Sequence, residues 1–341
     1  MKAGSGLASA PLAAPALAAD AVRRAIAAAG GERPSRVFLF LSAHFARQAP
    51  RAIQAAAGAA GGLQVSGMLA EGVFTEAGWR LDQPAVAALV LGQAGAGPGP
   101  SLVQPRLAFC GGPAFPPPGA DAAPRWGLTC RDALVWHDAR LCAPPCAEIQ
   151  IPGHALLGAL STGLHALGEA QEVTAVRGHD VLNLASASAA DSLRRALPPG
   201  LRDRSPLPVH LVAACEDGLP PIPILTANGD GSLCLARPPR VGARLQWALR
   251  QPLTAAADMA ASLESLAARC QNPACALVFS CIGRGPLFYD GEDRDLAALR
   301  RRFPGLPLAG AYGTGQIVPW NGGVAVLQNS VATVLFEPCH V

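Results

Sequence analysis

The pattern of apolar and polar positions predicts helices alternating with buried strands. A helical pattern over residues 20–30 ends at a glycine pair, and the continuous apolar run Val37–Ser42 follows it. A run of this kind is typical of a strand buried on both faces. A helix is also expected over residues 50–60, again ending at glycines, with strands over 63–67 and 85–91. This alternation indicates a mixed α/β fold.

The second half of the chain continues the alternation. Residues 172–176 and 181–184 are expected to form a hairpin, as are residues 224–226 and 233–235 around the Asn-Gly-Asp-Gly segment between them. The remaining expected elements are helices over 186–197, 254–268 and 293–303 and strands over 276–280, 306–310 and 331–336. Between the two halves, the Gly/Pro-dense segment 93–124 is interpreted as a loop or a family-specific insertion, although it contains the apolar run Leu107–Cys110.

One unit of this pattern occurs twice. Near the start and again near the end, a buried strand is followed by a helix, a short strand, a glycine-containing turn and another strand. Gly67 and Gly72 in the first copy have the same spacing as Gly310 and Gly315 in the second. The repeat predicts two pseudo-symmetric lobes, each with sheets flanked by helices. Because ligand pockets favour such interfaces, we expect a shared concave site between the lobes.

The motifs around the second copy resemble the FIST C domain. Residues 276–285, Ala-Leu-Val-Phe-Ser-Cys-Ile-Gly-Arg-Gly, and 308–317, Leu-Ala-Gly-Ala-Tyr-Gly-Thr-Gly-Gln-Ile, are similar to its Ser-Cys-x-x-Arg strand end and its Gly-x-Tyr-x-x-Gly-Glu-Ile segment. Residues 38–45, 65–73 and 173–184 resemble the FIST N domain more weakly. We therefore expect an extension with an opening helix over residues 1–34, a FIST N-like domain over 35–207 and a FIST C-like domain over 208–341.

This resemblance implies a bacterial-type, intracellular sensory module for signal transduction that binds a small ligand such as an amino acid. Some members of the family bind haem, sense nitric oxide and act with histidine kinases, so haem is a candidate cofactor, and a histidine kinase or another signalling protein is a candidate partner. Two residues depart from the family pattern. Gln316 replaces the family glutamate with a neutral amide, and Met68 stands where cysteine is common.

The expected ligand site combines the strand ends and the glycine turns of both copies. Its residues are Ser42, His44, Gly67, Glu71, Gly72, Ser280, Cys281, Arg284, Gly310, Tyr312, Gly315 and Gln316. A guanidinium such as Arg284 can receive a ligand carboxylate, or it can form a structural ion pair. Arg284 could also activate the thiol of Cys281, which leaves a thiol-dependent enzyme as an alternative. Tyr312 could either line a pocket or pack in the core.

Ten cysteines and seven histidines raise the question of a metal or haem. Cys142, Cys146, His137 and His154 form a weak candidate metal set, whose spacing matches no standard zinc pattern. Haem needs only one proximal imidazole, so His137, His154, His165, His179 and His210 all remain candidate ligands. Covalent haem attachment is excluded because the sequence has no Cys-x-x-Cys-His.

Composition narrows the remaining classes of function. The chain of 341 residues is 50% hydrophobic and 15% charged with a net charge of +3, so we expect no nucleic-acid partner. Charged residues, glycines and prolines interrupt every apolar stretch, so no membrane span is expected either. The Ala-rich start loosely resembles a signal peptide, but Pro11 and Pro15 break its apolar pattern and favour a cytoplasmic location.

Overall fold

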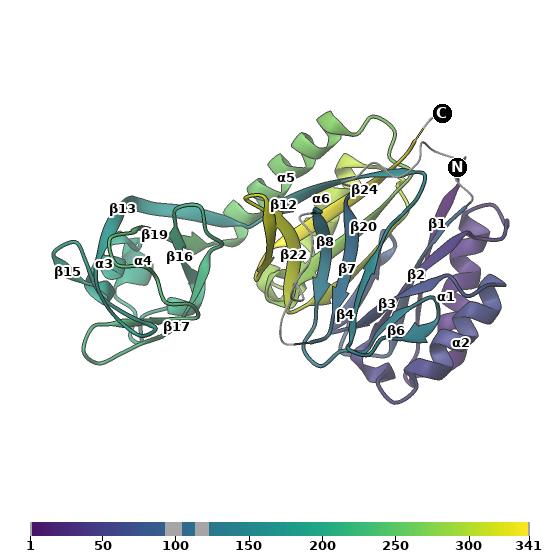
Figure 1. Ribbon diagram of the computed structural model, residues 1–341, viewed down its shortest axis with the longest axis horizontal. Helices are drawn as coiled ribbons and strands as arrows, with labels where there is room; N and C mark the ends of the chain where they lie inside the picture. Colours follow the sequence, from purple (N-terminus) through teal and green to yellow (C-terminus); the bar gives the residue numbers. More distant parts are fainter. Residues whose placement is uncertain (1, 93–103, 113–122, 340–341) are drawn as a thin grey trace. The chain divides into compact units, whose positions relative to one another are not determined.

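The protein has a mixed α/β fold, as expected from the sequence (Figure 1). The computed structural model describes residues 2–92, 104–112 and 123–339. These residues divide into two compact units: Met1–Thr162 together with Met259–Val341 form the larger unit, and Gly163–Asp258 form the smaller.

The first sheet of the larger unit has six strands in the order β1-β6-β2-β3-β9-β10. Their bounds are, in that order, Ala3–Ser9, Ala85–Leu91, Arg36–Ser42, Val65–Ala70, Val135–His137 and Arg140–Leu141. β2 and β3 run parallel, and β6 runs antiparallel to β2. Helices α1 (Pro15–Ala28) and α2 (Ala49–Ala60) flank this sheet and contribute buried side chains to the same core (Figure 1).

The second sheet has six strands in the order β12-β24-β20-β21-β4-β5. Their bounds are His154–Ser161, Val331–Pro338, Cys275–Cys281, Leu308–Gly313, Gly72–Thr75 and Gly78–Leu81. Helices α5 (Pro252–Arg269) and α6 (Arg294–Arg302) pack against it through Leu263 and Leu299, which share a buried cluster with Val278 of β20.

The strand pairings of the two sheets confirm the predicted duplication. β1-β6-β2-β3 and β12-β24-β20-β21 have the same order, and each set pairs antiparallel, antiparallel and then parallel. The second copy is interrupted in the chain. Its first strand, β12, ends just before residues 163–258, and most of its first helix, α5, follows them. In the first copy the helix at this position is α1. Both copies lie within the larger compact unit, so the predicted division into two lobes is not confirmed.

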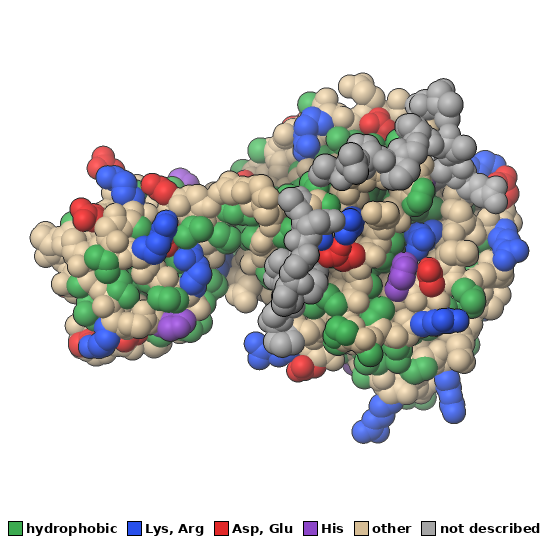
Figure 2. All heavy atoms as spheres, viewed as in Figure 1, with side chains coloured by type: hydrophobic (Ala, Val, Ile, Leu, Met, Phe, Trp, Pro, Cys, Tyr) green, Lys and Arg blue, Asp and Glu red, His purple; other side chains and the backbone are tan. Residues whose placement is uncertain are grey.

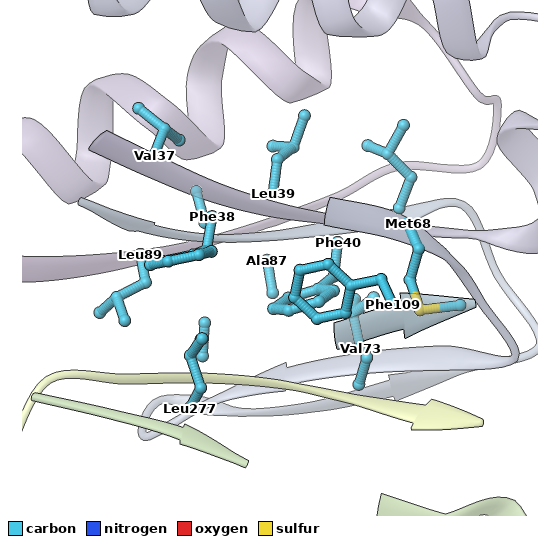
Figure 3. Close-up of a cluster of buried hydrophobic side chains, with 14 of the residues drawn as sticks. Val37, Phe38, Leu39, Phe40, Met68, Val73, Ala87, Leu89, Phe109 and Leu277 are labelled. Carbon is cyan, nitrogen blue, oxygen red and sulfur yellow. The ribbon is translucent and has the colours of Figure 1, made fainter. Parts of the chain in front are cut away.

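The core of the larger unit lies between the two sheets. Alternate residues of β2 point to opposite faces, so that Val37 and Leu39 point toward the helices while Phe38 and Phe40 point to the other side (Figure 3). There the ring of Phe40 meets that of Phe279 edge to face, with centroids 6.3 Å apart. Apolar side chains therefore bury both faces of this strand, as its sequence predicts.

A third sheet completes the larger unit. Its five strands have the order β11-β7-β8-β22-β23, with bounds Cys146–Ile149, Arg106–Cys110, Arg125–Thr129, Gly315–Trp320 and Gly323–Leu327. The predicted loop over 93–124 is thus partly wrong, because it contains β7. Hydrogen bonding to a strand on each side holds β7, and Phe109 packs against Phe40 at 5.6 Å. Residues 93–103 and 113–122 of that segment lie outside the described residues.

The smaller unit is a ring of strands with its own core. Its sheet order is β13-β19-β16-β17-β18-β14-β15, and a further pairing of β13 with β14 closes the ring. The bounds are Leu164–Arg177, Arg244–Arg250, Val212–Glu216, Ile222–Ala227, Leu233–Leu235, Asp180–Leu184 and Ala187–Ser188, with helices α3 (Ala189–Ala196) and α4 (Pro199–Arg202). Both predicted hairpins are present, as β13–β14 and β17–β18. Trp247 is buried and donates from Nε1 to Ser192 Oγ at 3.0 Å.

The Ala-rich start of the chain forms a strand that the sequence analysis missed. β1 pairs along its length with β6 and carries Gly4 and Gly6. A Cβ on these glycines would lie 2.2 Å from the Ala25 carbonyl oxygen and 2.1 Å from that of Ala21. The glycines therefore let α1 lie directly on the strand, and their absence of side chains removes the apolar pattern by which a strand is predicted.

The compact units and the predicted family domains divide the chain at different residues. The units change at residues 162/163 and 258/259, whereas the boundary expected between FIST N-like and FIST C-like domains lies at 207/208. A family domain is a division of the sequence, so that boundary stays a prediction. Among the described residues, no helix is both long and apolar enough to cross a membrane.

Candidate functional site

The duplicated glycine turns meet in the second sheet. β4 follows the first turn and pairs antiparallel with β21 of the second copy, which places Gly72 opposite Tyr312 and Phe74 opposite Gly310. The backbone N–H of Glu71 donates to the Tyr312 carbonyl at 2.9 Å. The two turns predicted from the sequence are therefore neighbours in the structure.

Close packing accounts for the glycines at these turns. A Cβ on Gly67 would lie 1.8 Å from the Leu39 carbonyl oxygen, and one on Gly310 would lie 2.2 Å from the Phe74 ring. Phe74 itself packs on Tyr312, with ring centroids 4.8 Å apart. The Leu39 backbone and the Phe74 ring thus occupy the space next to these two glycines, and a role for the glycines in ligand binding stays a prediction.

Two further glycines of the predicted site are packed in the same way. Gly72 has a Leu81 side-chain carbon 2.2 Å from the position of its absent Cβ, and Gly315 has a Val326 carbon at 2.6 Å. Both glycines are buried in strands. Their part in a ligand site also remains untested.

Arg284 has a carboxylate partner within the chain. It is 2% exposed, and its Nε and Nη2 each lie 3.2 Å from an oxygen of Asp295. Its Nη1 donates to the Ser161 carbonyl at 3.2 Å, and Nη2 donates to Ser161 Oγ at 2.8 Å. This is the structural ion pair that the sequence left open as one interpretation of Arg284.

Tyr312 belongs to the same buried polar cluster. Its hydroxyl donates to Asp293, which caps α6 by accepting from the Leu296 N–H at 2.8 Å. Tyr289 donates to Asp295 at 3.0 Å. Burial raises the pKa of Asp295 to about 6, and it also raises the pKa of Asp293. The cluster fixes the start of α6 against β21.

The serines of the predicted site end equivalent strands. Ser42 is buried at the end of β2 and accepts from the Ala85 N–H at 3.0 Å, and Ser280 donates to the Cys281 carbonyl at 3.4 Å near the end of β20. His44 is exposed on the short 3-10 helix that follows β2. Cys281 is 4% exposed, and its Sγ lies 4.0 Å from the Thr314 carbonyl.

Gln316 and Glu71 have contrasting surroundings. Gln316 is fully buried, and its Oε1 accepts from Ser330 Oγ at 2.8 Å. Among the residues that the structure describes, its Nε2 has no hydrogen-bond partner. Glu71 is exposed, and Cys130 donates to its Oε1 at 3.5 Å. Burial, reinforced by Glu71, raises the pKa of Cys130 to about 12.

The candidate metal set is not assembled. Cys146 pairs with Cys110, His137 Nδ1 contacts Ser66 Oγ at 3.0 Å, and His154 Nδ1 contacts the Pro152 carbonyl at 3.1 Å. In the part of the chain that the structure describes, no three His, Cys, Asp or Glu side chains are placed to hold a metal ion. Haem binding stays a prediction. Of the five candidate haem ligands, His137 and His154 belong to the larger unit, and His165, His179 and His210 belong to the smaller.

A polar hollow in the larger unit was missed by the sequence analysis. Its volume is about 390 Å³, and it is lined by Arg36, Arg106, His137, Glu148 and Gln150. Arg36 and Arg106 begin β2 and β7, His137 ends β9, and Gln150 follows β11. Figure 2 shows basic, acidic and histidine side chains gathered on one face of the larger unit.

Ion pairs hold one side of this hollow. Glu148 accepts from Arg106 Nη1 at 3.0 Å and from Arg125 Nε at 2.6 Å. Arg125 is 1% exposed and also donates to the Ala123 carbonyl. The buried Arg125 therefore neutralises the charge of Glu148, while the Arg106 side chain, 25% exposed, borders the hollow.

A hydrogen-bonded chain holds the other side. Arg36 Nη1 donates to Ser66 Oγ at 3.4 Å, so the Ser66 hydroxyl can donate to Nδ1 of His137. His137 Nε2 then faces Asp138 at 3.5 Å. Burial lowers the pKa of Arg36, whose side chain is 19% exposed and lies 3.7 Å from Asp138.

The hollow and its immediate supports carry a small positive excess. Three arginines face two carboxylates, Glu148 and Asp138, while His137 adds charge only when protonated. Guanidinium groups bind carboxylates in a bidentate manner, and partial burial strengthens such contacts. The arrangement suits a small ligand that bears a carboxylate.

One sequence signal could have indicated the hollow. Arg106 and Arg125 each begin a short apolar strand of the Gly/Pro-rich region, and Arg36 begins the strand that continues with Val37. Because β7 and β8 are parallel neighbours, Arg106 and Arg125 lie at the same edge of the third sheet. The signal went unused because β7 was interpreted as part of a loop.

A second hollow, of about 530 Å³, lies in the smaller unit at the turn between β17 and β18. Its polar groups largely satisfy one another. Asp230 accepts from the Ser232 backbone and hydroxyl at 3.0 and 2.6 Å, and Arg177 donates to Asp230 at 3.0 Å. These hydrogen bonds account for the turn without a ligand.

Comparison with known proteins finds a matching domain family and several relatives. Residues 181–319 match the FIST C domain. Over 218 residues, 60% of this chain, the sequence is 27% identical to the uncharacterized proteins Mb0898c of Mycobacterium bovis and MT0897 of Mycobacterium tuberculosis, with 56% of each relative covered. Rv0628c of Mycobacterium tuberculosis, also uncharacterized, is 24% identical with 57% covered. The chain thus spans about half the length of these curated relatives.

The FIST C domain belongs to a family of sensory and signalling domains. The match over residues 181–319 confirms the resemblance to the FIST family that the sequence predicted.

Proposed function

We propose that the chain is a small-molecule sensor whose ligand, a compound bearing a carboxylate such as an amino acid, binds in the hollow between Arg36 and Arg106. The observation that carries this proposal is the pair of half-buried guanidinium groups bordering a hollow of about 390 Å³. That volume lies within the usual range for small-molecule sites. The FIST C match supports the sensory class.

The groups in the hollow suit the two ends of an amino acid. A ligand carboxylate placed between Arg36 and Arg106 would receive charge-assisted hydrogen bonds. Glu148 has accepting capacity beyond its two arginine contacts, and Gln150 adds an amide oxygen, so either can accept from an ammonium group. Arg125, beneath Glu148, holds that carboxylate in place.

Signalling would follow from the elements that the ligand joins. Arg36 and His137 belong to the first sheet, whereas Arg106 and Glu148 belong to the third. A ligand that contacts both sheets favours the conformation in which they are correctly spaced. A histidine kinase or another signalling protein would act as the separate partner that detects this change.

Thermal shifts of the purified chain with a panel of amino acids, small carboxylates and their amides would test the proposal. A ligand at 100 times its Kd stabilises the folded state by about 2.7 kcal/mol. We expect a carboxylate to raise Tm where its amide does not, and Arg36→Gln or Arg106→Gln to weaken binding at least tenfold. Arg140→Gln, exposed in β10 opposite His137, is the matched control.

Two outcomes would contradict this assignment. A panel in which carboxylates and amides shift Tm equally would remove the role of the guanidinium groups. Binding that survives Arg36→Gln and Arg106→Gln would place the ligand elsewhere, and the duplicated turns would then be the next candidate. Their supporting observation is the buried, unpartnered Nε2 of Gln316.

The two alternatives from the sequence have separate tests. A Soret band in protein expressed with haem supply would support the gas-sensor alternative. For the thiol enzyme, iodoacetamide would have to label Cys281 faster than a model thiol does, although only 4% of this residue is exposed.

A further inference from the structure

Two thiols face each other across the outer strand pair of the third sheet. Cys110 of β7 and Cys146 of β11 are direct partners in the antiparallel register. The neighbouring Gly111 N–H donates to the Pro145 carbonyl at 2.8 Å, which marks Cys110 and Cys146 as a non-hydrogen-bonded pair. In such pairs the Cα atoms are about 4.5 Å apart and the side chains lie on the same face.

We propose that Cys110 and Cys146 form a reversible disulfide when the protein meets a hydroperoxide. This inference does not depend on the proposed ligand site. A disulfide requires Cα atoms about 4.4–6.8 Å apart and side chains that point toward each other, and a non-hydrogen-bonded pair meets both conditions. Because the two residues already face each other in the strand register, the bond would form without a rearrangement of the strands.

The environment of the pair also supplies a nucleophile. Hydrogen bonding between the two thiols lowers the pKa of Cys110 to about 6 and raises that of Cys146. A lowered pKa favours the thiolate, the form that reacts with peroxides. Burial instead raises the pKa values of Cys130, Cys270 and Cys275.

The reaction is balanced by the two thiols and one peroxide. The Cys110 thiolate attacks a peroxide oxygen and breaks the O–O bond, which gives a sulfenic acid at Cys110 and, for hydrogen peroxide, a hydroxide that takes a proton from solvent and leaves as water. The Cys146 sulfur then attacks the Cys110 sulfur and displaces hydroxide, which leaves as a second water with the Cys146 proton. Both sulfurs are oxidised and the peroxide is reduced.

The position of the pair gives the bond a structural effect. β11 is an edge strand of the third sheet and holds Glu148 on the same face as Cys146. Cys110 is 1% exposed, whereas Cys146 is half-buried beside it. A bond between them would tie the edge strand covalently to β7.

Peptide mapping of the oxidised full-length chain tests the proposal. The protein is treated with hydrogen peroxide, its remaining thiols are blocked with N-ethylmaleimide, and it is digested with trypsin. Cys110 lies alone in the tryptic peptide 107–125, whereas Cys142 and Cys146 share 141–177. We expect these two peptides to become linked at least tenfold faster than Cys130 is lost, and dithiothreitol to separate them.

Variants assign the bond within peptide 141–177. Cys142→Ala should keep the link, because Cys142 is four residues away with a similar degree of exposure, and Cys146→Ala should abolish it. A link that persists in Cys146→Ala, or oxidation of Cys110 to sulfinic acid without any link in the wild type, would overturn the proposal. The wild type and Cys142→Ala decide the question even if Cys146→Ala fails to fold.

Discussion

Arg284 and Asp295 form a bidentate ion pair inside the larger unit, with both N–O distances at 3.2 Å and both residues almost fully buried. A second carboxylate, that of Asp293, lies in the same cluster and raises the pKa of Asp295 further. Arg284 neutralises Asp295, and Arg300 only partly offsets the charge of Asp293, whose pKa stays raised. This imbalance decides how the cluster responds to mutation and to pH.

The imbalance predicts unequal effects of removing either partner of the pair. Arg284→Met leaves Asp295 without its cation beside a second buried acid and should cost about 3–5 kcal/mol of unfolding free energy. Asp295→Asn removes the excess negative charge and keeps an oxygen that can accept from Tyr289, so its cost should be well below that of Arg284→Met. Urea denaturation at pH 7 measures both.

The control for this comparison is an exposed ion pair. Arg194 lies 3.4 Å from Asp191 with both side chains about half exposed, and Arg194→Met should change stability by less than about 1 kcal/mol. Equal losses in Arg284→Met and Asp295→Asn would show that the pair acts as a balanced unit and that Asp293 is protonated.

The same cluster predicts a pH dependence of stability. The pKa of Asp295 is raised by burial to about 6 in the folded protein, against 3.8 for the free side chain. The folded state therefore binds the proton more tightly, so this group's contribution is fully present below about pH 4 and is lost as the pH rises through 6. The difference amounts to at most about 3 kcal/mol at 1.36 kcal/mol per pKa unit.

Asp295→Asn isolates this contribution from the other carboxylates. The difference in unfolding free energy, wild type minus Asp295→Asn, should decrease as the pH is raised from 4 to 7. Urea titration of both proteins at each pH measures this difference. A flat difference across this range would show that folding leaves the pKa of this carboxyl unchanged, and a difference that rises with pH would show that folding lowers it.

The strongly patterned elements were predictable from the sequence, and the elements without a pattern were not. The apolar run Val37–Ser42 predicts a strand that is buried on both faces, and the structure confirms it. β1 could not be recognised from the sequence. Gly4 and Gly6 allow α1 to pack closely on this strand, and because they have no side chains the strand shows no apolar alternation. Pro15, which was taken to interrupt the pattern, begins α1, where a missing N–H costs nothing.

In the candidate site too, features set by nearby residues could be predicted from the sequence, whereas contacts between residues far apart in the chain could not. The spacing of the glycine turns correctly indicated that the two copies are equivalent. Whether Gly310 faces a ligand or the Phe74 ring depends on which strand pairs with β21, and that strand, β4, comes from the other copy. The charged hollow was harder to foresee, because Arg36 and Glu148 are far apart in the sequence and meet only through the order of the sheets.

Close packing at the first turn predicts the effect of adding one methyl group. Gly67→Ala would place a Cβ 1.8 Å from the Leu39 carbonyl oxygen, so β2 and β3 must separate, at a cost of about 1–3 kcal/mol or more. Gly58→Ala in α2 has no neighbouring atom within 4 Å and should stabilise the chain by about 0.5–1 kcal/mol. Thermal denaturation of both variants compares them directly, and equal effects would show that β3 can move away at no cost.

Gln316 offers a final test, because its environment accepts an amide more readily than a carboxylate. The side chain is fully buried and its Oε1 accepts from Ser330, and among the described residues no basic side chain donates to it. Gln316→Glu would restore the residue typical of the FIST C motif, but burial without a cation would raise the pKa of the new carboxyl. We therefore expect Gln316→Glu to be close to the wild type in stability at pH 5 and less stable by about 1–3 kcal/mol at pH 8. Ser330→Ala in the Gln316→Glu background should enlarge that loss, since it removes the hydroxyl donor. A Gln316→Glu variant that is equally stable at both pH values would contradict this expectation and would reveal a cation near Gln316 that compensates the charge.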